Sequence, residues 1–148
     1  MKQAAQIELP QDLIPQLTKI IQDGDPDMLV KLARDVGKQL KEMEATKSQV
    51  RNVFGTVRQI QMRWAKPDSQ EAFGCYRDAV LLKPKLSYYA NKERSQSKNQ
   101  GMRYLESILS PALDLVSGDE RQRHTRFNRF VDFFEAIVAY HHAAGARD

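Results

Sequence analysis

Residues 127–140, FNRFVDFFEAIVAY, decide the fold of this chain. At about 100° per residue they place apolar side chains along one face of a helix, which we expect to run from Asp119-Glu120 to about Ala144. The members of that face are Phe127, Phe130, Val131, Phe134, Ile137 and Val138. Phe133 and Tyr140 widen the face. A face this wide is typical of a central helix against which several neighbours pack.

The first half of the chain also predicts helices, because no long stretch alternates apolar and polar residues. Gly24 ends a short helix, and Asp25-Pro26 opens a second one with a capping carboxylate and an N-terminal proline. Thr46 and Gln49 have the spacing of a capping box that starts a third helix, which ends at Pro67. We therefore expect an all-α fold: a compact bundle of five to six helices in a single domain.

The chain after residue 67 is interrupted by prolines and by one polar stretch. A helix that begins near Asp68 should kink or break near Leu82, because Pro84 cannot donate to the helical hydrogen bonds, and should resume up to Asn91. Its expected buried side chains are Phe73, Tyr76, Val80 and Leu81. Residues 91–101 contain no aliphatic or aromatic side chain, which predicts an exposed, basic and mobile loop. A short helix from Met102, bent by a proline, leads to the last helix.

Length and composition exclude several classes of protein. The 148 residues suit one domain with a buried core, and 41% apolar with 28% charged residues exclude a disordered chain. No apolar run approaches the roughly 18 residues of a membrane span, and the N-terminus lacks the apolar stretch of a secretion signal. The single Cys75 can form no internal disulfide and fits a reducing compartment. We therefore expect a cytoplasmic protein.

The positive charge is concentrated in the middle of the chain. Residues 1–45 hold six basic and eight acidic groups, a net of −2, whereas residues 46–103 hold twelve and four, a net of +8. Residues 104–148 hold five and seven, again a net of −2. A basic segment of this kind attracts phosphate backbones, although it is also compatible with a solvated surface rich in Lys and Arg.

The third predicted helix orders three of these cations. With Lys47 at 0°, Arg51 falls near 40° and Arg58 near 20° at about 100° per residue, so the three line one edge beside the apolar face. Such a row can follow successive phosphates. Further basic candidates are Lys83, Lys85 and Lys92, with Arg63, Arg94 and Lys98 as weaker ones. Tyr88 and Tyr89 are expected to pack in the core, although an exposed tyrosine could stack on a base.

Residues for catalysis or metal binding do not converge anywhere in the sequence. His141 and His142 are adjacent and so point about 100° apart on a helix, which favours a pair of surface histidines over a metal site. Asp132 and Glu135 lie three residues apart on the last helix, where they are solvated or share a basic partner. Phosphate-binding glycine loops and nucleophile elbows are absent. We predict no catalytic residue, no metal ligand and no cofactor.

Three segments together resemble one family. They are TKSQVRNV (46–53), LKPKLSYYANKE (82–93) and FVDFFEAIVAY (130–140). The chain is similar, on these segments, to the small helical subunit of type III-A CRISPR-Cas effector (Csm) complexes. Asn91 replaces the family's usual Gly, and Lys92 replaces an Arg, which keeps the charge but loses the bidentate fork. Residues 46–148 thus resemble the family's helical core, whereas residues 1–45 form an N-terminal helical segment with no recognised counterpart.

The resemblance implies a non-catalytic subunit in a prokaryotic cytoplasm. Several copies would lie beside the crRNA-bearing backbone and contact target RNA as it pairs with the guide. Its partners would be crRNA and target RNA, the backbone and large subunits, and other copies of itself, with RNA cleavage left to the backbone subunits. The expected phosphate contacts are Lys47, Arg51, Arg58, Lys83, Lys85 and Lys92. We expect Asp132 and Glu135 to face neighbouring subunits.

Two other functions fit the same composition. A helical adaptor that binds only proteins would use the basic row against an acidic partner, with no nucleic acid. A helix-turn-helix regulator would place the third helix in the major groove of DNA. Asn52 and Gln59 are too few side chains for reading base edges, which makes this second alternative the weaker one.

Overall fold

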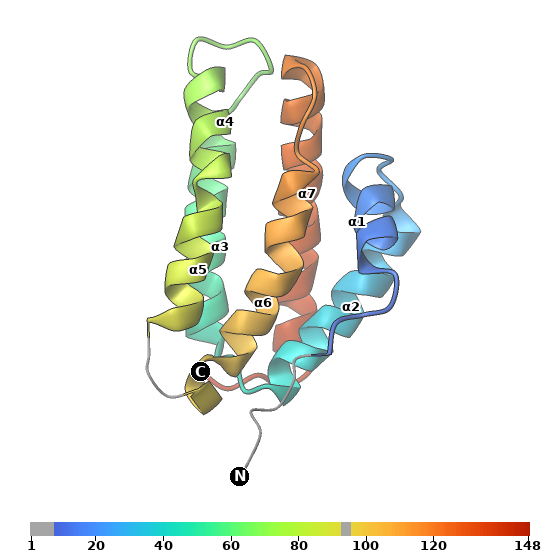
Figure 1. Ribbon diagram of the computed structural model, residues 1–148, viewed down its shortest axis with the longest axis vertical. Helices are drawn as coiled ribbons and strands as arrows, with labels where there is room; N and C mark the ends of the chain where they lie inside the picture. The colour runs from blue at the N-terminus through green and yellow to red at the C-terminus, as the bar shows by residue number, and fades with distance from the viewer. Residues whose placement is uncertain (1–7, 93–95) are drawn as a thin grey trace.

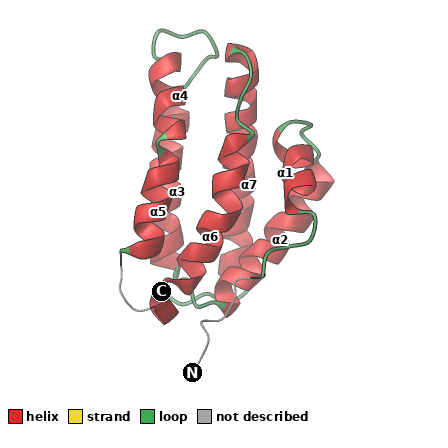
Figure 2. Cartoon of the chain, viewed as in Figure 1, coloured by secondary structure: helices red, strands yellow, loops and turns green. Residues whose placement is uncertain are grey.

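The structure of the chain, a computed structural model, describes residues 8–92 and 96–148, and of residues 96–99 only the backbone. Every regular element within these ranges is a helix (Figure 2), which confirms the all-α prediction. The helices are α1 (Leu13–Ile21), α2 (Pro26–Glu42), α3 (Lys47–Arg63), α4 (Ala72–Val80), α5 (Leu82–Asn91), α6 (Gln96–Asp114) and α7 (Glu120–Ala143). None of them is long and apolar enough to cross a membrane.

The helices form two layers. One layer consists of α3, α7 and α2, with α7 in the middle, and the other of α4 and α5, then α6, then α1. Figure 1 shows α3, α4 and α5 on one side of the bundle and α1 and α2 on the other, with α6 and α7 between them. Because α7 packs against α1, α2, α3, α4 and α6, the prediction of a central last helix is confirmed.

An aromatic ladder joins α7 to α3. Phe127, Phe130 and Phe134 on α7 are fully buried. The Trp64 ring at the end of α3 lies 5.3 Å from the Phe127 ring, and the Phe54 ring meets that of Phe134 edge to face at 5.2 Å. Each such aromatic pair contributes about 0.5–1.5 kcal/mol beyond its buried area. The ladder therefore fixes the rotation of α3 relative to α7.

The predicted start of α3 is confirmed. The backbone N–H of Gln49 donates to the Thr46 hydroxyl at 3.1 Å, and the Gln49 side chain accepts from the Thr46 N–H at 2.9 Å. Asp25 caps α2 in the expected way, with its carboxylate accepting from Asp27 and Met28. These local hydrogen bonds satisfy the free N–H groups of each first turn.

The break caused by Pro84 is also confirmed. α4 ends at Val80 and α5 begins at Leu82, so that Pro84 lies in the first turn of α5, where its missing N–H costs no helical hydrogen bond. α5 ends at Asn91, as predicted, and the Asn91 amide donates to the Ser87 carbonyl at 2.8 Å.

The predicted buried face of α4 is wrong in three of its four residues. Phe73 is 73% exposed, and Val80 and Leu81 are nearly half exposed, whereas Tyr76 is partly buried. The buried side chains are the small ones, Ala72, Cys75 and Ala79. They also recur at helical spacing, and their size lets α4 approach its neighbours closely. Periodicity alone favoured the larger residues, and tertiary packing selected the smaller stripe.

The predicted loop over residues 91–101 is wrong for its second half. α6 starts at Gln96, and Gly101 is buried against the turn that joins α2 to α3. A Cβ atom on Gly101 would lie 2.7 Å from the Ala45 Cβ, so this close approach needs glycine. The first turn of α6 carries no apolar side chain, which hid the helix from the sequence analysis. Residues 93–95 lie outside the described residues.

The prediction that His141 lies at the surface is wrong. Its side chain is buried, with 1% of the residue exposed. Its Nε2–H donates to the Ala45 carbonyl oxygen at 2.8 Å and so joins the end of α7 to the turn between α2 and α3. His142 is exposed, as expected. Burial lowers the pKa of His141, and the hydrogen bond to Ala45 only partly offsets this.

We predict that Gly37→Ala destabilises the protein by about 1–3 kcal/mol through overpacking. A Cβ atom there would lie 2.7 Å from the backbone nitrogen of His141 and 2.8 Å from the Tyr140 Cβ. Gly55→Ala is the matched control, because a Cβ at that helical position meets nothing within 4 Å. It should stabilise by about 0.5–1 kcal/mol. Urea unfolding of both variants measures the difference, and equal effects would contradict the tight contact of α2 with α7.

We also predict that the free energy of unfolding falls as the pH drops below about 6.5, the ordinary pKa of histidine. The unfolded chain binds a proton at His141 in this range, whereas the folded chain, with its lowered pKa, does not. The free energy of unfolding stops falling for this reason once the pH is below the pKa of His141 in the folded chain. Urea unfolding between pH 7.5 and about 5.5 measures it. His141→Gln should remove this part of the pH dependence and His142→Gln should keep it; the same slope in both variants would refute the assignment.

Candidate nucleic-acid interface

The basic row of α3 is built on a buried apolar face. Val50, Val53 and Val57 are buried against the bundle, which directs Arg51 and Arg58 into solvent. Neither arginine forms an ion pair with any side chain among the described residues. The Arg58 guanidinium donates to the side-chain oxygen of Gln61, a neutral partner. Neither positive charge is therefore neutralised by a carboxylate within the described residues, and an external anion can approach both groups.

Lys47, at the start of α3, is more enclosed. Its side chain is 22% exposed, and its Nζ lies 3.6 Å from an oxygen of the Asp148 carboxylate. That carboxylate is 94% exposed, and a surface pair of this kind contributes about 0–1 kcal/mol. A phosphate can therefore replace Asp148 as the partner of Lys47.

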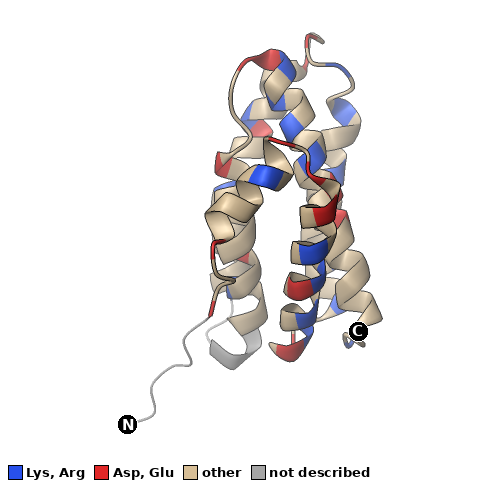
Figure 3. Ribbon diagram, turned by 90° about the vertical axis from the view of Figure 1, so that its right-hand side faces the viewer, with Lys and Arg blue, Asp and Glu red and all other residues tan. Residues whose placement is uncertain are grey.

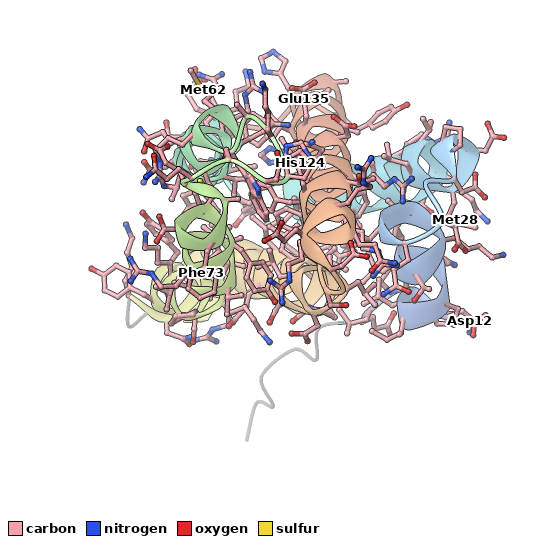
Figure 4. All side chains as sticks on the ribbon, turned by 90° about the horizontal axis from the view of Figure 1, so that it is seen from above. Asp12, Met28, Met62, Phe73, His124 and Glu135 are labelled. Atoms are coloured by element: carbon pink, nitrogen blue, oxygen red, sulfur yellow. The ribbon has the colours of Figure 1, made fainter. Side chains whose placement is uncertain are left out.

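The α3 row faces the α7 side of its layer. The Gln61 amide donates to the Asn128 side-chain oxygen on α7 at 3.1 Å. Asp132 is exposed as a residue, but partial desolvation of its carboxyl and the neighbouring Glu135 raise its pKa, and Arg58 partly offsets this. The Asp132 carboxylate, which is assigned with Glu135 to subunit contacts, therefore lies within electrostatic range of Arg58. In Figure 4, Glu135 lies on α7 at the same face of the bundle as Met62 of α3.

The second basic cluster divides between two sides of α5. Lys83 forms an ion pair with Asp114 of α6. Lys85 is exposed and helps to lower the pKa of Asp78 on α4, so it faces the opposite side of α5. Lys92 is exposed, with its Nζ 5.5 Å from the centre of the Tyr89 ring. Since α5 belongs to the other layer, these lysines do not extend the α3 row.

The weaker candidates fare differently. Arg63 donates to the Asp78 carboxylate at 2.8 Å, and this pair lowers the pKa of Asp78. Arg63 points to the α4 side of α3, away from Arg51 and Arg58. Arg94 lies outside the described residues, and the side chain of Lys98 is not among those described.

The two tyrosines of α5 have different environments. Tyr88 is 65% exposed, which corrects the expectation of core packing, while Tyr89 is partly buried against the core. The two rings meet edge to face at 5.8 Å. Tyr88 thus offers an exposed aromatic ring between Lys85 and Lys92.

Two histidines and the cysteine have structural surroundings within the bundle. The His124 Nε2–H donates to the Trp64 carbonyl at 2.9 Å, and His141 is buried. Burial raises the pKa of the Cys75 thiol, which opposes formation of a thiolate. Within residues 8–92 and 96–148 no group of three or more His, Cys, Asp or Glu residues could hold a metal ion.

α2 carries a basic row that was not predicted from the sequence. Its members, at spacings of three, four and three residues, are Lys31, Arg34, Lys38 and Lys41. The net charge of −2 over residues 1–45 concealed the row, because acidic residues elsewhere in that segment cancel it. The helical spacing was the signal that could have found it.

Comparison with known proteins gives one result. A family model described as Csm2 Type III-A matches residues 23–147. The match begins before α2 and so includes part of the segment for which the sequence analysis found no counterpart. A search of curated proteins and a search of solved structures each found no significant match.

Proposed function

Because this chain belongs to the Csm2 type III-A family and is a small subunit of a type III-A CRISPR-Cas complex, we propose that it is a non-catalytic RNA-binding subunit. Several copies line the duplex of crRNA and target RNA in the prokaryotic cytoplasm and contact target-RNA phosphates. The subunit reads no sequence, because guide pairing supplies the specificity.

The α3 row is the observation that carries this proposal. Arg51 and Arg58 are exposed, share one edge, and have no ion-pair partner among the described residues. Arginine forks match phosphate oxygens, and phosphate contacts position a nucleic acid without identifying its bases. Lys47 extends the row at its first residue.

The lysines of α5 contact a different stretch of RNA in this proposal. Lys85 and Lys92 are exposed, and Lys83 exchanges its exposed partner Asp114 for phosphate. Because α5 and α3 lie in different layers, these contacts involve a separate part of the RNA. Arg63 contributes least, since its guanidinium is held by Asp78.

We predict that Arg51→Ala with Arg58→Ala removes about two phosphate contacts. The slope of log affinity against log salt should then fall by about 1.4 for a single-stranded RNA, at about 0.7 for each contact. Lys19→Ala with Lys66→Ala is the charge-matched control, since both lysines are exposed outside the row. Fluorescence anisotropy with a labelled RNA at several salt concentrations measures the slopes. An unchanged slope in a folded Arg51/Arg58 variant would remove these residues from the site.

Binding by the isolated subunit tests the class of function. It should bind single-stranded RNA in preference to duplex DNA. A folded subunit that binds neither nucleic acid but still copurifies with the other subunits of the complex would favour the protein-only adaptor.

We also predict that Asp132→Asn with Glu135→Gln impairs assembly of the complex before it affects RNA binding, because these exposed carboxylates are proposed to meet neighbouring subunits. Copurification with the other subunits measures assembly, and anisotropy measures RNA binding. Asp68→Asn with Glu71→Gln is the matched control, with two exposed carboxylates before α4. Unimpaired assembly of the Asp132/Glu135 variant would refute the assignment.

A further inference from the structure

The basic row of α2 has no role in the function proposed above. Lys31, Arg34 and Lys38 are exposed, and Lys41 is partly exposed. Residues three and four apart on a helix are neighbours, so the four cations form one continuous stripe. Figure 3 faces this side of the molecule, where basic residues recur along α2 among acidic ones.

The contact between α2 and α7 holds this row in place. Gly37 lies so close to the His141 backbone that only its lack of a side chain allows the approach. Beside this contact, Arg34, Asp35 and Lys38 line a hollow of about 250 Å³ together with Tyr140 and Ala143 of α7. Two cations and one exposed carboxylate on α2 thus border a concave surface of a size that admits a phosphate group.

The α2 row leads towards the α3 row through the C-terminal segment. A second hollow, of about 460 Å³, is lined by Lys41 at the end of α2 and by Arg147, among others. The backbone N–H of Lys47, the first residue of α3, donates to the Arg147 carbonyl at 2.7 Å. Lys41, Arg147 and Lys47 are therefore successive cations around one end of the bundle, which we call the basic corner.

The acidic residues of the basic corner form only long ion pairs. Glu42 lies 4.0 Å from the Lys41 Nζ, and Glu44 lies 3.8 Å from the Arg147 guanidinium. The pair of Lys47 with Asp148 is 3.6 Å long. All three carboxylates are exposed, so solvent screens these pairs and a phosphate can replace them.

The composition of this surface favours a nucleic acid over an acidic protein. Protein interfaces contain a core of aromatic and other apolar side chains. Among the described residues, Val30 is the large exposed hydrophobic side chain on α2, and Met62 lies beyond the end of the α3 row. The surface from Lys31 to Arg58 thus carries few large apolar side chains, and its cations outnumber the carboxylates of Asp35, Glu42, Glu44 and Asp148. This composition suits a phosphate backbone better than a protein partner.

We propose that the RNA track on α3 continues through the basic corner onto α2, so that one RNA strand follows both rows. This inference rests on the proposed function of α3. The α2 row spans about 15 Å and the α3 row about 16 Å at 1.5 Å per residue. Each length corresponds to about four or five nucleotides at 3.4 Å per nucleotide along a strand. The continued track therefore about doubles the length of RNA held by one subunit.

The test compares two double variants of the full chain on a labelled 12-nucleotide single-stranded RNA. Arg34→Ala with Lys38→Ala removes two cations of the α2 row, and Arg51→Ala with Arg58→Ala removes two of the α3 row. Lys19→Ala with Lys66→Ala is the charge-matched control. Each row variant should lower the salt slope by about 1.4, and the control should leave it unchanged. Circular dichroism confirms that each variant is folded, and native mass spectrometry should give one RNA for each subunit.

The outcomes separate this inference from the proposed function. If the salt slope falls in the α3 variant but not in the α2 variant, the continued track is overturned and the proposed function of α3 stands. If the salt slope falls in the α2 variant alone, the role of α3 is refuted, and with it the continuous track. Two RNA molecules for each subunit, of which the α2 variant keeps one, would show two separate sites and overturn a single track. If the salt slope falls in both variants and each subunit binds one RNA molecule, the proposal is supported.

Discussion

The burial of α7 is the constraint on which the rest of this molecule depends. Phe127, Phe130 and Phe134 are fully enclosed, with α3 on one side and α2 on the other. On the α3 side the contact is aromatic, through Trp64 and Phe54. On the α2 side the backbones approach closely at Gly37. Both neighbours are thereby held at fixed rotations, and a fixed rotation is what turns evenly spaced cations into directed rows.

Local chemistry made much of the fold predictable. The capping box of Thr46, the cap and proline of α2, and the break before Pro84 each depend on residues within a few positions of one another, so the sequence alone contains the cause. The centrality of α7 was predictable for a related reason, since a wide apolar face needs several partners. The predictions at α4, Gly101 and His141 were wrong because the environment of each depends on packing against a segment distant in the sequence. No local pattern specifies such packing.

The candidate site was predictable only in part for the same reason. Helical spacing placed Lys47, Arg51 and Arg58 on one edge, because that geometry is local to α3. It could not reveal that Lys83 meets Asp114 or that Arg63 meets Asp78, since those partners lie on other helices. The net charge of residues 1–45 was also misleading for α2. The net charge of a segment does not say on which face of a helix each charged side chain lies. That placement decides whether opposite charges cancel at the surface.

The mixed charge of the exposed face bears on how such a subunit would work. Asp132 lies within electrostatic range of Arg58, and the basic corner carries three carboxylates in long pairs, so one isolated copy should bind RNA weakly. A subunit that binds weakly and lies beside identical copies gains affinity through multivalency, because each bound copy raises the effective concentration of the next. In the proposed function, weak contacts in each copy keep binding dependent on assembly. Free subunits then do not compete for cellular RNA.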